Sequence, residues 1–308
     1  MGMEFSLKDS VARARCSLEG LAVGDAFGET FFIHPELVEG LIAERALAMR
    51  TWPYTDDTMM AMSIFSVLRQ RGHIDQELLA RSFAERYDRT RGYGPAMHRL
   101  LWEINCGEAW AERAQSLFGG QGSFGNGAAM RVAPLGAFFA DDIEAVVEQA
   151  IRSSVITHTH DEAIAGAIAV AVAAAQAFGL RRSAAVPARP EFLDLILPYV
   201  PESEVRSKIR QARDMAANAS VQFAVSVLGN GTRVSAQDTV PFALWCAGEQ
   251  LTNYEEALWL TVSGLGDRDT TCAIVGGIVA SYTGSDAIPR AWMDTREPLP
   301  DWPFSEDQ

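Results

Sequence analysis

The chain has few cysteines and a shortage of positive charge, and both exclude several classes of protein. Among its 308 residues only four are cysteines, and they lie too far apart for a Cys-x-x-Cys motif: Cys16, Cys106, Cys246 and Cys272. This pattern argues against a disulfide-rich secreted scaffold or a structural zinc module, and predicts reduced thiols in a cytoplasmic protein. Lys and Arg number 26 against 40 Asp and Glu, giving a net charge of −14. Such a surface repels phosphate backbones, so nonspecific nucleic-acid binding is not expected.

Membrane-spanning segments, strand patterns and common nucleotide or serine-hydrolase motifs are also lacking. The longest apolar run, Ala163 to Phe178, is short for a membrane span and is interrupted by Gln176. It favours a core helix and no membrane association. No sustained apolar–polar alternation, βαβ rhythm or long repeat is visible. There is no Gly-Lys-Ser/Thr phosphate loop and no Gly-x-Ser-x-Gly nucleophile elbow.

Apolar residues at helical spacing dominate the chain, which predicts an all-α fold in one compact domain over residues 1–308, with an irregular tail from about 288. We expect a monomer. Pro134 is expected to limit the helix after the glycine-rich loop, and Val221–Leu228 fits either a helix or a strand. The predicted helices are Val11–Ala26, Asp57–Arg71, Gln76–Tyr87, Ala96–Ile104, Asp142–Val155, Asp161–Gly179, Phe192–Leu197, Glu204–Ala217, Thr239–Glu249, Tyr254–Ser263 and Thr270–Ser281.

Two short acidic stretches each stand where a helix is predicted to begin. The first is Thr55-Asp56-Asp57-Thr58, and the second, Asp267-Arg268-Asp269-Thr270, follows a glycine-containing approach. Adjacent carboxylates repel one another and stay ionised most easily beside a cation. Carboxylate and hydroxyl oxygens are the ligands that Mg²⁺ and Mn²⁺ prefer. Either stretch alone is also typical of a capped helix start, but two of like composition favour one shared site for two divalent cations.

A glycine-rich loop, Gly119 to Gly127, suggests a second kind of site. Its glycines expose backbone N–H groups and a helix start is predicted directly after it, a geometry that receives anions such as phosphate. Arg131 would pair with a phosphate or with an internal Asp. His158 and His160 precede a predicted long helix; without a third zinc ligand in reach, they fit a helix cap, a hydrogen-bonded core group or a ligand contact.

These stretches occur in an order that resembles the ADP-ribosylglycohydrolases, and the resemblance spans nearly the whole chain. The motifs that carry it are Gly24-Asp25-Ala26-Phe27-Gly28, Thr55-Asp56-Asp57-Thr58, Arg91-Gly92-Tyr93-Gly94, Gly125-Asn126-Gly127-Ala128-Ala129-Met130-Arg131, Thr157-His158 and Asp267-Arg268-Asp269-Thr270. The resemblance implies an all-α fold with a binuclear Mg²⁺ or Mn²⁺ centre. It also implies cleavage of the glycosidic bond at C1″ of the distal ribose of an ADP-ribosyl group.

Carried over position by position, the resemblance implies three kinds of residue. The implied metal ligands are Thr55, Asp56, Asp57, Asp267, Asp269 and Thr270. The implied substrate contacts are Asp25, Tyr93, Gly94, Gly122, Ser123, Phe124, Gly125, Asn126, Gly127, Met130, His158 and Arg268. The implied catalytic groups are Asp56, Asp57 and Glu29. In metal-assisted hydrolysis, Asp56 or Asp57 would take a proton from the attacking water.

Two positions depart from the family pattern. Many members have Thr between the two late Asp residues, where this chain has Arg268, which would point away from the site or touch a phosphate. Many members also have a Glu seven residues after the Asp of the first motif, where this chain has Phe32. Glu29 and Glu36 lie nearby, and Glu29 is the better candidate for the missing carboxylate.

The function predicted from the resemblance is metal-dependent removal of ADP-ribose, from ADP-ribosyl-arginine protein in the first instance. Serine, O-acetyl and nucleic-acid conjugates remain open as substrates, and so does the choice between Mg²⁺ and Mn²⁺. Two other classes compete: a noncatalytic ADP-ribose binder, which Phe32 permits, and a di-metal phosphohydrolase, which would release phosphate. The intact acidic stretches favour the enzyme, since a binder has less need of a full double-metal shell.

Overall fold

A computed structural model describes residues 7–181, 183 and 185–305. All secondary-structure elements assigned within these ranges are helices. This agrees with the predicted all-α class. The three 3₁₀ helices are η1 (Asn126–Ala128), η2 (Leu197–Tyr199) and η3 (Ser285–Ala287). The α-helices are α1 (Leu7–Glu29), α2 (Pro35–Ala43), α3 (Asp56–Arg71), α4 (Gln76–Glu85), α5 (Pro95–Asn105), α6 (Trp110–Gly120), α7 (Ala133–Phe138), α8 (Ile143–Ser154), α9 (Asp161–Leu180), α10 (Arg189–Ile196), α11 (Glu204–Asp214), α12 (Val221–Leu228), α13 (Ala236–Glu249), α14 (Tyr254–Val262), α15 (Arg268–Thr283) and α16 (Arg290–Thr295).

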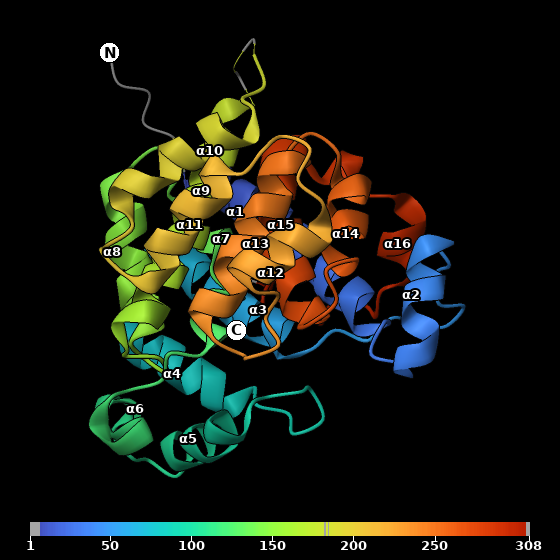
Figure 1. The fold of residues 1–308 in the computed structure, drawn as a ribbon. Coiled ribbons are helices and arrows are strands. Elements are labelled where there is room, and N and C mark those ends of the chain that lie inside the picture. Colours follow the sequence, from blue (N-terminus) through green and yellow to red (C-terminus); the bar gives the residue numbers. More distant parts are fainter. Residues whose placement is uncertain (1–6, 182, 184, 306–308) are drawn as a thin grey trace.

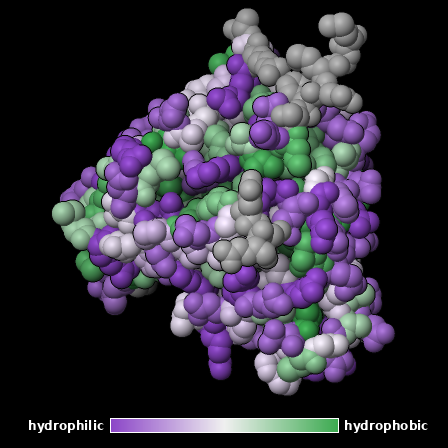
Figure 2. Space-filling model, turned by 180° about the vertical axis from the view of Figure 1, so that it is seen from behind, coloured by the Kyte–Doolittle hydropathy of each residue, from purple (hydrophilic) through white to green (hydrophobic). Residues whose placement is uncertain are grey.

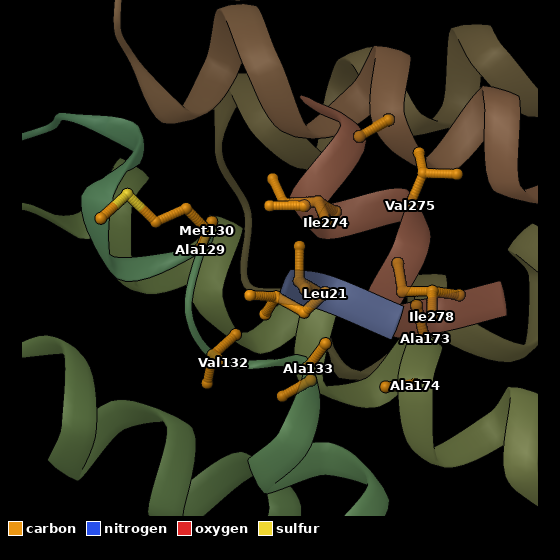
Figure 3. Packing of buried hydrophobic residues seen from close by; sticks show 14 of the residues in the cluster. Leu21, Ala129, Met130, Val132, Ala133, Ala173, Ala174, Ile274, Val275 and Ile278 are labelled. Carbon is orange, nitrogen blue, oxygen red and sulfur yellow. The ribbon is translucent and has the colours of Figure 1, made fainter. Parts of the chain in front are cut away.

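Helices α1 and α15 lie together inside the bundle, although they come from opposite ends of the chain (Figure 1). Helices α3 and α7 pack against α1, while α9, α13 and α14 pack against α15. Figure 3 shows Leu21 of α1 between Ile274 and Ile278 of α15 on one side and Val132 and Ala133 on the other. Because the middle parts of α9 and α15 are surrounded by protein, they need no polar face, and each contains a long run of mostly small apolar residues.

Glycines set the short distance between α1 and α15. Gly20, Gly24 and Gly28 recur every fourth residue and therefore share one face of α1. A Cβ added to Gly24 would lie 2.1 Å from the carbonyl oxygen of Cys272, and one added to Gly28 would lie 2.2 Å from that of Arg268. The two backbones are thus in contact, and only glycine fits between them. This contact places the end of α1 beside the start of α15.

Most predicted helices are present, with their ends shifted by a few residues. Val221–Leu228 is helical, and the hydroxyl of Ser220 caps it by accepting the N–H of Phe223 at 3.2 Å. Pro134 stands in the first turn of α7, where its missing N–H is not needed, so it starts a helix rather than limiting one. Helices α2 and α6 are not predicted from the sequence. Such short helices depend on packing more than on their own periodicity.

The tail after residue 288 is more ordered than predicted. It contains α16, whose Trp292 stacks on Phe27 of α1 with ring centroids 4.6 Å apart. The backbone N–H of Trp52 donates to the carbonyl of Thr295 at 3.0 Å, and that of Glu297 donates to the carbonyl of Trp52 at 2.9 Å. Buried aromatic surface therefore draws the tail onto α1, and the tail in turn holds the segment that leads into α3.

The long apolar run forms a core helix, as the sequence predicts. One helix among the described residues, α9, is long and apolar enough to cross a membrane, but 72% of its apolar window is buried inside the fold. Its apolar surface is therefore already used in packing, as in a core helix. All four cysteines are free. Seen from behind, the surface intersperses hydrophilic and hydrophobic residues (Figure 2).

We expect Gly24→Ala to lower the free energy of unfolding by at least about 2 kcal/mol, because the added methyl group meets the backbone of α15. The matched control is Gly40→Ala in α2, where an added Cβ meets nothing within 4 Å. That change should leave stability equal or raise it by up to about 1 kcal/mol, through helix propensity. Urea unfolding followed by circular dichroism measures both. Equal stability of the two variants would contradict the close contact.

Candidate metal centre and ligand cleft

The carboxylate of Asp25, buried on α1, organises the start of α3. Its Oδ2 accepts hydrogen bonds from the backbone N–H groups of Thr55 and Thr58, at 2.9 and 3.1 Å, and from the Thr58 hydroxyl at 2.5 Å. Its Oδ1 accepts from the Thr55 hydroxyl at 2.8 Å. The N-cap residue Thr55 makes no side-chain cap bond of its own. The first backbone N–H groups of α3 are therefore capped by a carboxylate from another helix, and not by the side chain of the N-cap residue.

Asp56 and Asp57 form the first turn of α3, directly beyond this anchor. The N–H of Asp56 donates to the carbonyl of Arg91 at 2.7 Å. The Oδ2 of Asp57 is 3.1 Å from the hydroxyl of Thr55, whereas its Oδ1 is buried and has no hydrogen-bond partner among the described residues. An orphaned carboxylate oxygen at a helix start is an open ligand position.

Arg91 fastens the loop that covers this turn. Its guanidinium makes two hydrogen bonds to the carboxylate of Glu297, both at 2.7 Å, and a third to the carbonyl of Tyr54 at 2.9 Å. The ring of Tyr54 lies 4.1 Å below it. The side chain of Arg91 therefore joins the C-terminal tail to the segment before α3, and its backbone carbonyl accepts the N–H of Asp56.

The second acidic stretch enters through a strained turn. Leu265 and Gly266 have φ values of 57° and 67°, in the left-handed region. A Cβ added to Gly266 would lie 2.2 Å from the carbonyl oxygen of Asn230, so the turn is packed against that residue. The same carbonyl accepts the N–H of Asp267 at 3.0 Å. This turn directs Asp267 and the first residues of α15 into the site.

The structure brings the two acidic stretches face to face. The hydroxyl of Thr270 lies 3.5 Å from Oδ2 of Asp57, although the two residues are 213 positions apart. The Nδ2 of Asn126, from the glycine-rich loop, donates to Oδ2 of Asp267 at 2.6 Å. Three segments that are distant in the sequence therefore converge at one point.

The negative charge of this cluster is not balanced by protein cations. Among the described residues, none of its carboxylates has a Lys or Arg nitrogen within 4.0 Å. Burial, followed by repulsion from Asp25, raises the pKa of Asp56 to about 8 and raises that of Asp57 well above its ordinary value. Burial and then Asp267 do the same to the pKa of Asp269. Deprotonated carboxylates here require positive charge from elsewhere.

The chemistry of these residues fits divalent cations. The fit rests on the orphaned Oδ1 of Asp57, on the uncompensated carboxylates, and on an all-oxygen donor set suited to hard ions. Within the described ranges, no three His, Cys, Asp or Glu side chains already form a group that could hold a metal. The residues therefore fit divalent cations by their chemistry, while the structure shows the two acidic stretches in contact only through Thr270 and Asp57.

A cleft of about 580 Å³ opens beside the cluster. Three kinds of residue line it: acidic groups and a hydroxyl from α3 and α15, the glycine-rich loop, and aromatic or apolar side chains. From the predicted site they are Asp56, Tyr93, Gly94, Ser123, Phe124, Gly125, Asn126, Gly127, Met130, His158, Asp267, Asp269 and Thr270. Thr55 and Asp57 are buried and are not part of the lining.

His158 presents a neutral ring to the glycine-rich loop. Burial, with a smaller contribution from the cation of Arg131, lowers the pKa of His158 to about 3. Its Nδ1 lies 2.7 Å from the hydroxyl of Thr157, which accepts a hydrogen bond from Arg131 at 2.9 Å. The hydroxyl proton of Thr157 has no other acceptor within the described residues, so it points at Nδ1. The hydrogen of the neutral ring then resides on Nε2, near Gly125 and Gly127.

Arg131 takes neither of the partners expected from the sequence. Arg131 is fully buried, so it does not reach the surface of the cleft, and it forms no ion pair with an Asp among the described residues. Instead its Nη2 donates to the carbonyl of Ser153 at 3.1 Å and to the hydroxyl of Thr157. Its guanidinium lies 4.5 Å over the ring of Phe83. Burial lowers its pKa to about 9, which leaves it charged at neutral pH. Arg131 therefore supports His158 from behind.

Two predicted substrate contacts lie outside the cleft lining. Asp25 is fully buried and is not part of the cleft lining, because its oxygens are occupied by the start of α3. Gly122 also lies outside the lining. It has a φ of 75°, and a Cβ there would lie 2.0 Å from the hydroxyl of Thr159. Neither residue lines the cleft, and a ligand contact by either stays a prediction.

Glu29 and Arg268 do not line the cleft either. The guanidinium of Arg268 lies 4.4 Å over the ring of Phe32, so the two departures from the family pattern pack against each other. Glu29 is half-buried at the end of α1, and burial, with a smaller contribution from Asp25, raises its pKa. The predicted catalytic role of Glu29 is therefore not supported by its position.

Several cleft residues are missed by the sequence analysis, namely Met60, Gly92, Pro95, Ala96, Met97, Phe118, Arg233 and Val234. Two of them have unusual backbones: Phe118 has a φ of 52° and Val234 a φ of 51°. Non-glycine residues in this region are uncommon and often mark functional sites. No sequence pattern predicts these two conformations, since β-branched residues such as Val favour an extended backbone with a negative φ.

Comparison with known proteins gives the same family over nearly the whole chain. The family model described as ADP-ribosylglycohydrolase matches residues 7–304. The ADP-ribosylhydrolase ARH3 of Xenopus tropicalis is 29% identical over 93% of this chain and 91% of its own length, and that of Homo sapiens is 27% identical over 94% and 90%. An uncharacterized protein of Archaeoglobus fulgidus is 31% identical over 94% and 92%. A solved structure titled "ADP-ribosylglycohydrolase-related protein complex" shares the fold, with a TM-score of 0.63, 24% identity and 94% coverage of both chains.

We expect Mg²⁺ or Mn²⁺ to raise the melting temperature, because bound cations balance the buried carboxylates. Asp57→Asn should raise the melting temperature of the metal-free protein by a few degrees, roughly 1 kcal/mol, because it replaces a buried carboxyl whose ionisation is opposed by burial and by Asp25. It should also remove most of the response to metal. Thermal unfolding with metal or with EDTA measures both effects, and Glu148→Gln on exposed α8 is the charge-matched control. A full metal response in Asp57→Asn would contradict the centre.

We expect the ring of His158 to stay neutral from about pH 8 to pH 5, which an NMR titration of its ring resonances would show as an absence of shift. The folded pKa of about 3 lies below the ordinary value of 6.5. The stability that the neutral ring contributes is therefore complete above pH 6.5 and is lost as the pH falls toward 3. His158→Asn should lose less stability than the unchanged protein over that range. A ring that titrates near 6.5 would refute the assignment.

Proposed function

The chain belongs to the ADP-ribosylglycohydrolase family and is an enzyme of that family; from this premise we propose that it hydrolyses the bond between C1″ of an ADP-ribosyl group and its acceptor, with two divalent cations. The observation that carries the proposal is the uncompensated cluster of buried carboxylates that opens on the 580 Å³ cleft. A site with a large negative charge suits a cation-dependent reaction better than the binding of a dianionic ligand alone.

The metal ligands in this proposal are Thr55, Asp56, Asp57, Asp267, Asp269 and Thr270. The cations would supply positive charge for substrate hydroxyls and would lower the pKa of a bound water. Asp56 is the carboxylate of α3 that lines the cleft, so it is the better placed of the two to receive a proton from water. Asp57, buried behind it, holds and orients the centre.

The rest of the cleft suits the other parts of an ADP-ribosyl group. The glycine-rich loop exposes backbone N–H groups toward the diphosphate. The rings of Phe118 and Phe124 line the cleft, with centroids 6.1 Å apart, and offer faces on which adenine would stack. The Nε2–H of His158 is a neutral donor for a ribose hydroxyl or a phosphate oxygen.

The acceptor that we propose first is an arginine side chain on a protein, with serine, O-acetyl and nucleic-acid conjugates as the other candidates. Each carries the same ADP-ribosyl group, so the cleft residues named above would serve all of them. We further propose that the protein acts as a monomer in the cytoplasm, in line with its free thiols.

We expect release of free ADP-ribose from an ADP-ribosylated protein with Mg²⁺ or Mn²⁺, and none with EDTA. Asp57→Asn and Asp269→Asn should each lower the rate at least about a hundredfold, since each removes a charged ligand of the centre. The measurement is chromatographic detection of ADP-ribose from arginine, serine and O-acetyl conjugates in parallel, with Glu148→Gln as control. Full turnover by either Asn variant, or release of phosphate instead of ADP-ribose, would refute the proposal.

A further inference from the structure

The turn between α12 and α13, residues 229–235, forms a wall of the cleft. None of the sequence motifs quoted above includes it. It contributes Arg233 and Val234 to the lining. Val234 is 56% exposed and has a φ of 51°, a backbone that β-branched residues rarely adopt. Strain of this kind persists only where surrounding contacts hold the chain in place.

Such contacts are present within the turn. Gly231, with a φ of 87°, donates its N–H to the carbonyl of Asp238 at 2.9 Å, and its own carbonyl accepts the N–H of Val234 at 2.7 Å. The buried carboxylate of Asp238 accepts the N–H of Arg233 at 2.9 Å. The backbone at Arg233 is therefore held in place, while the residue as a whole is exposed.

The turn is also bonded to both functional parts of the site. On one side, the N–H of Ala236 donates to the carbonyl of Phe124 at 3.0 Å, and Ser235 pairs with Gly125 in an isolated β-bridge. On the other side, the carbonyl of Asn230 accepts the N–H of Asp267 at 3.0 Å. The turn thus spans the gap between the glycine-rich loop and the acidic cluster.

Arg233 is the only cationic side chain among the described residues that line the cleft, whose other charged groups are Asp56, Asp267 and Asp269. No carboxylate of the described residues lies within ion-pair distance of its guanidinium. An exposed arginine with no partner among the described residues, carried on a turn that is bonded to the glycine-rich loop, is suited to a ligand phosphate.

We propose that Arg233 is a specificity-determining contact for a phosphate of the bound ADP-ribosyl group, presented by the 229–235 turn; this rests on the function proposed above. The guanidinium donates to phosphate oxygens on the side of the glycine-rich loop. It thereby holds the anionic part of the ligand away from the carboxylates, while the uncharged distal ribose occupies the acidic end.

The test is calorimetric binding of three ligands that carry two, one and no phosphates, namely ADP-ribose, AMP and adenosine, to the metal-loaded protein. Arg233→Gln should weaken ADP-ribose binding by about tenfold or more, the usual effect of losing a charge-assisted hydrogen bond. Adenosine binding should change less than about twofold, since it offers no phosphate. Arg233→Lys should recover part of the loss, because it keeps the charge but not the bidentate geometry.

Arg81→Gln, which removes the same charge from an exposed position outside this cleft, is the matched control and should bind all three ligands as the unchanged protein does. Added salt should weaken ADP-ribose binding more in the unchanged protein than in Arg233→Gln. Equal ADP-ribose affinity in the unchanged protein and Arg233→Gln would overturn the phosphate contact alone. An equal loss for adenosine would overturn it too, because the arginine would then contact the base. Absence of ADP-ribose binding by the unchanged protein would overturn the proposed function and this inference together.

Discussion

The backbone contact between α1 and α15 is the constraint on which the site depends. Because Gly24 and Gly28 bring the end of α1 against the start of α15, Asp25 lies within reach of the first turn of α3. Its carboxylate then caps that turn and holds Asp57 opposite Thr270. A side chain at Gly24 or Gly28 would push the two helices apart and so separate the two acidic stretches, even though every candidate metal ligand would still be present in the sequence.

The buried carboxylates repel one another, and no cationic side chain among the described residues forms an ion pair with them. Burial and mutual repulsion raise the pKa values of Asp56, Asp57 and Asp269, and the neighbouring cations are occupied elsewhere. Arg131 supports His158, and Arg268 stacks on Phe32. Divalent cations bound as proposed would offset this repulsion, while packing of the helical core holds the carboxylates in place.

The cleft has a division of charge that matches a ligand with two unlike ends. Its acidic residues stand at helix starts, and the phosphate contacts that we propose belong to the glycine-rich loop and the 229–235 turn. The side-chain amide of Asn126 donates to the carboxylate of Asp267, and the carbonyl of Asn230 accepts the N–H of Asp267, so both parts are tied to that residue. The spacing between the two ends is therefore fixed by backbone geometry and not by long flexible side chains, which limits the entropy lost on binding.

The sequence by itself determined the helical class, most of the helices, and the two acidic stretches with the glycine-rich loop, because apolar periodicity and helix-start chemistry are local properties. Only the tertiary structure decided that Asp25 is a cap, that Glu29 and Arg268 lie outside the cleft, and that Phe118, Arg233 and Val234 line it. The tail helix α16 likewise depends on the stacking of Trp292 on Phe27, at the other end of the chain. These outcomes rest on contacts between distant segments and on left-handed backbones at ordinary residues, neither of which leaves a pattern in neighbouring positions.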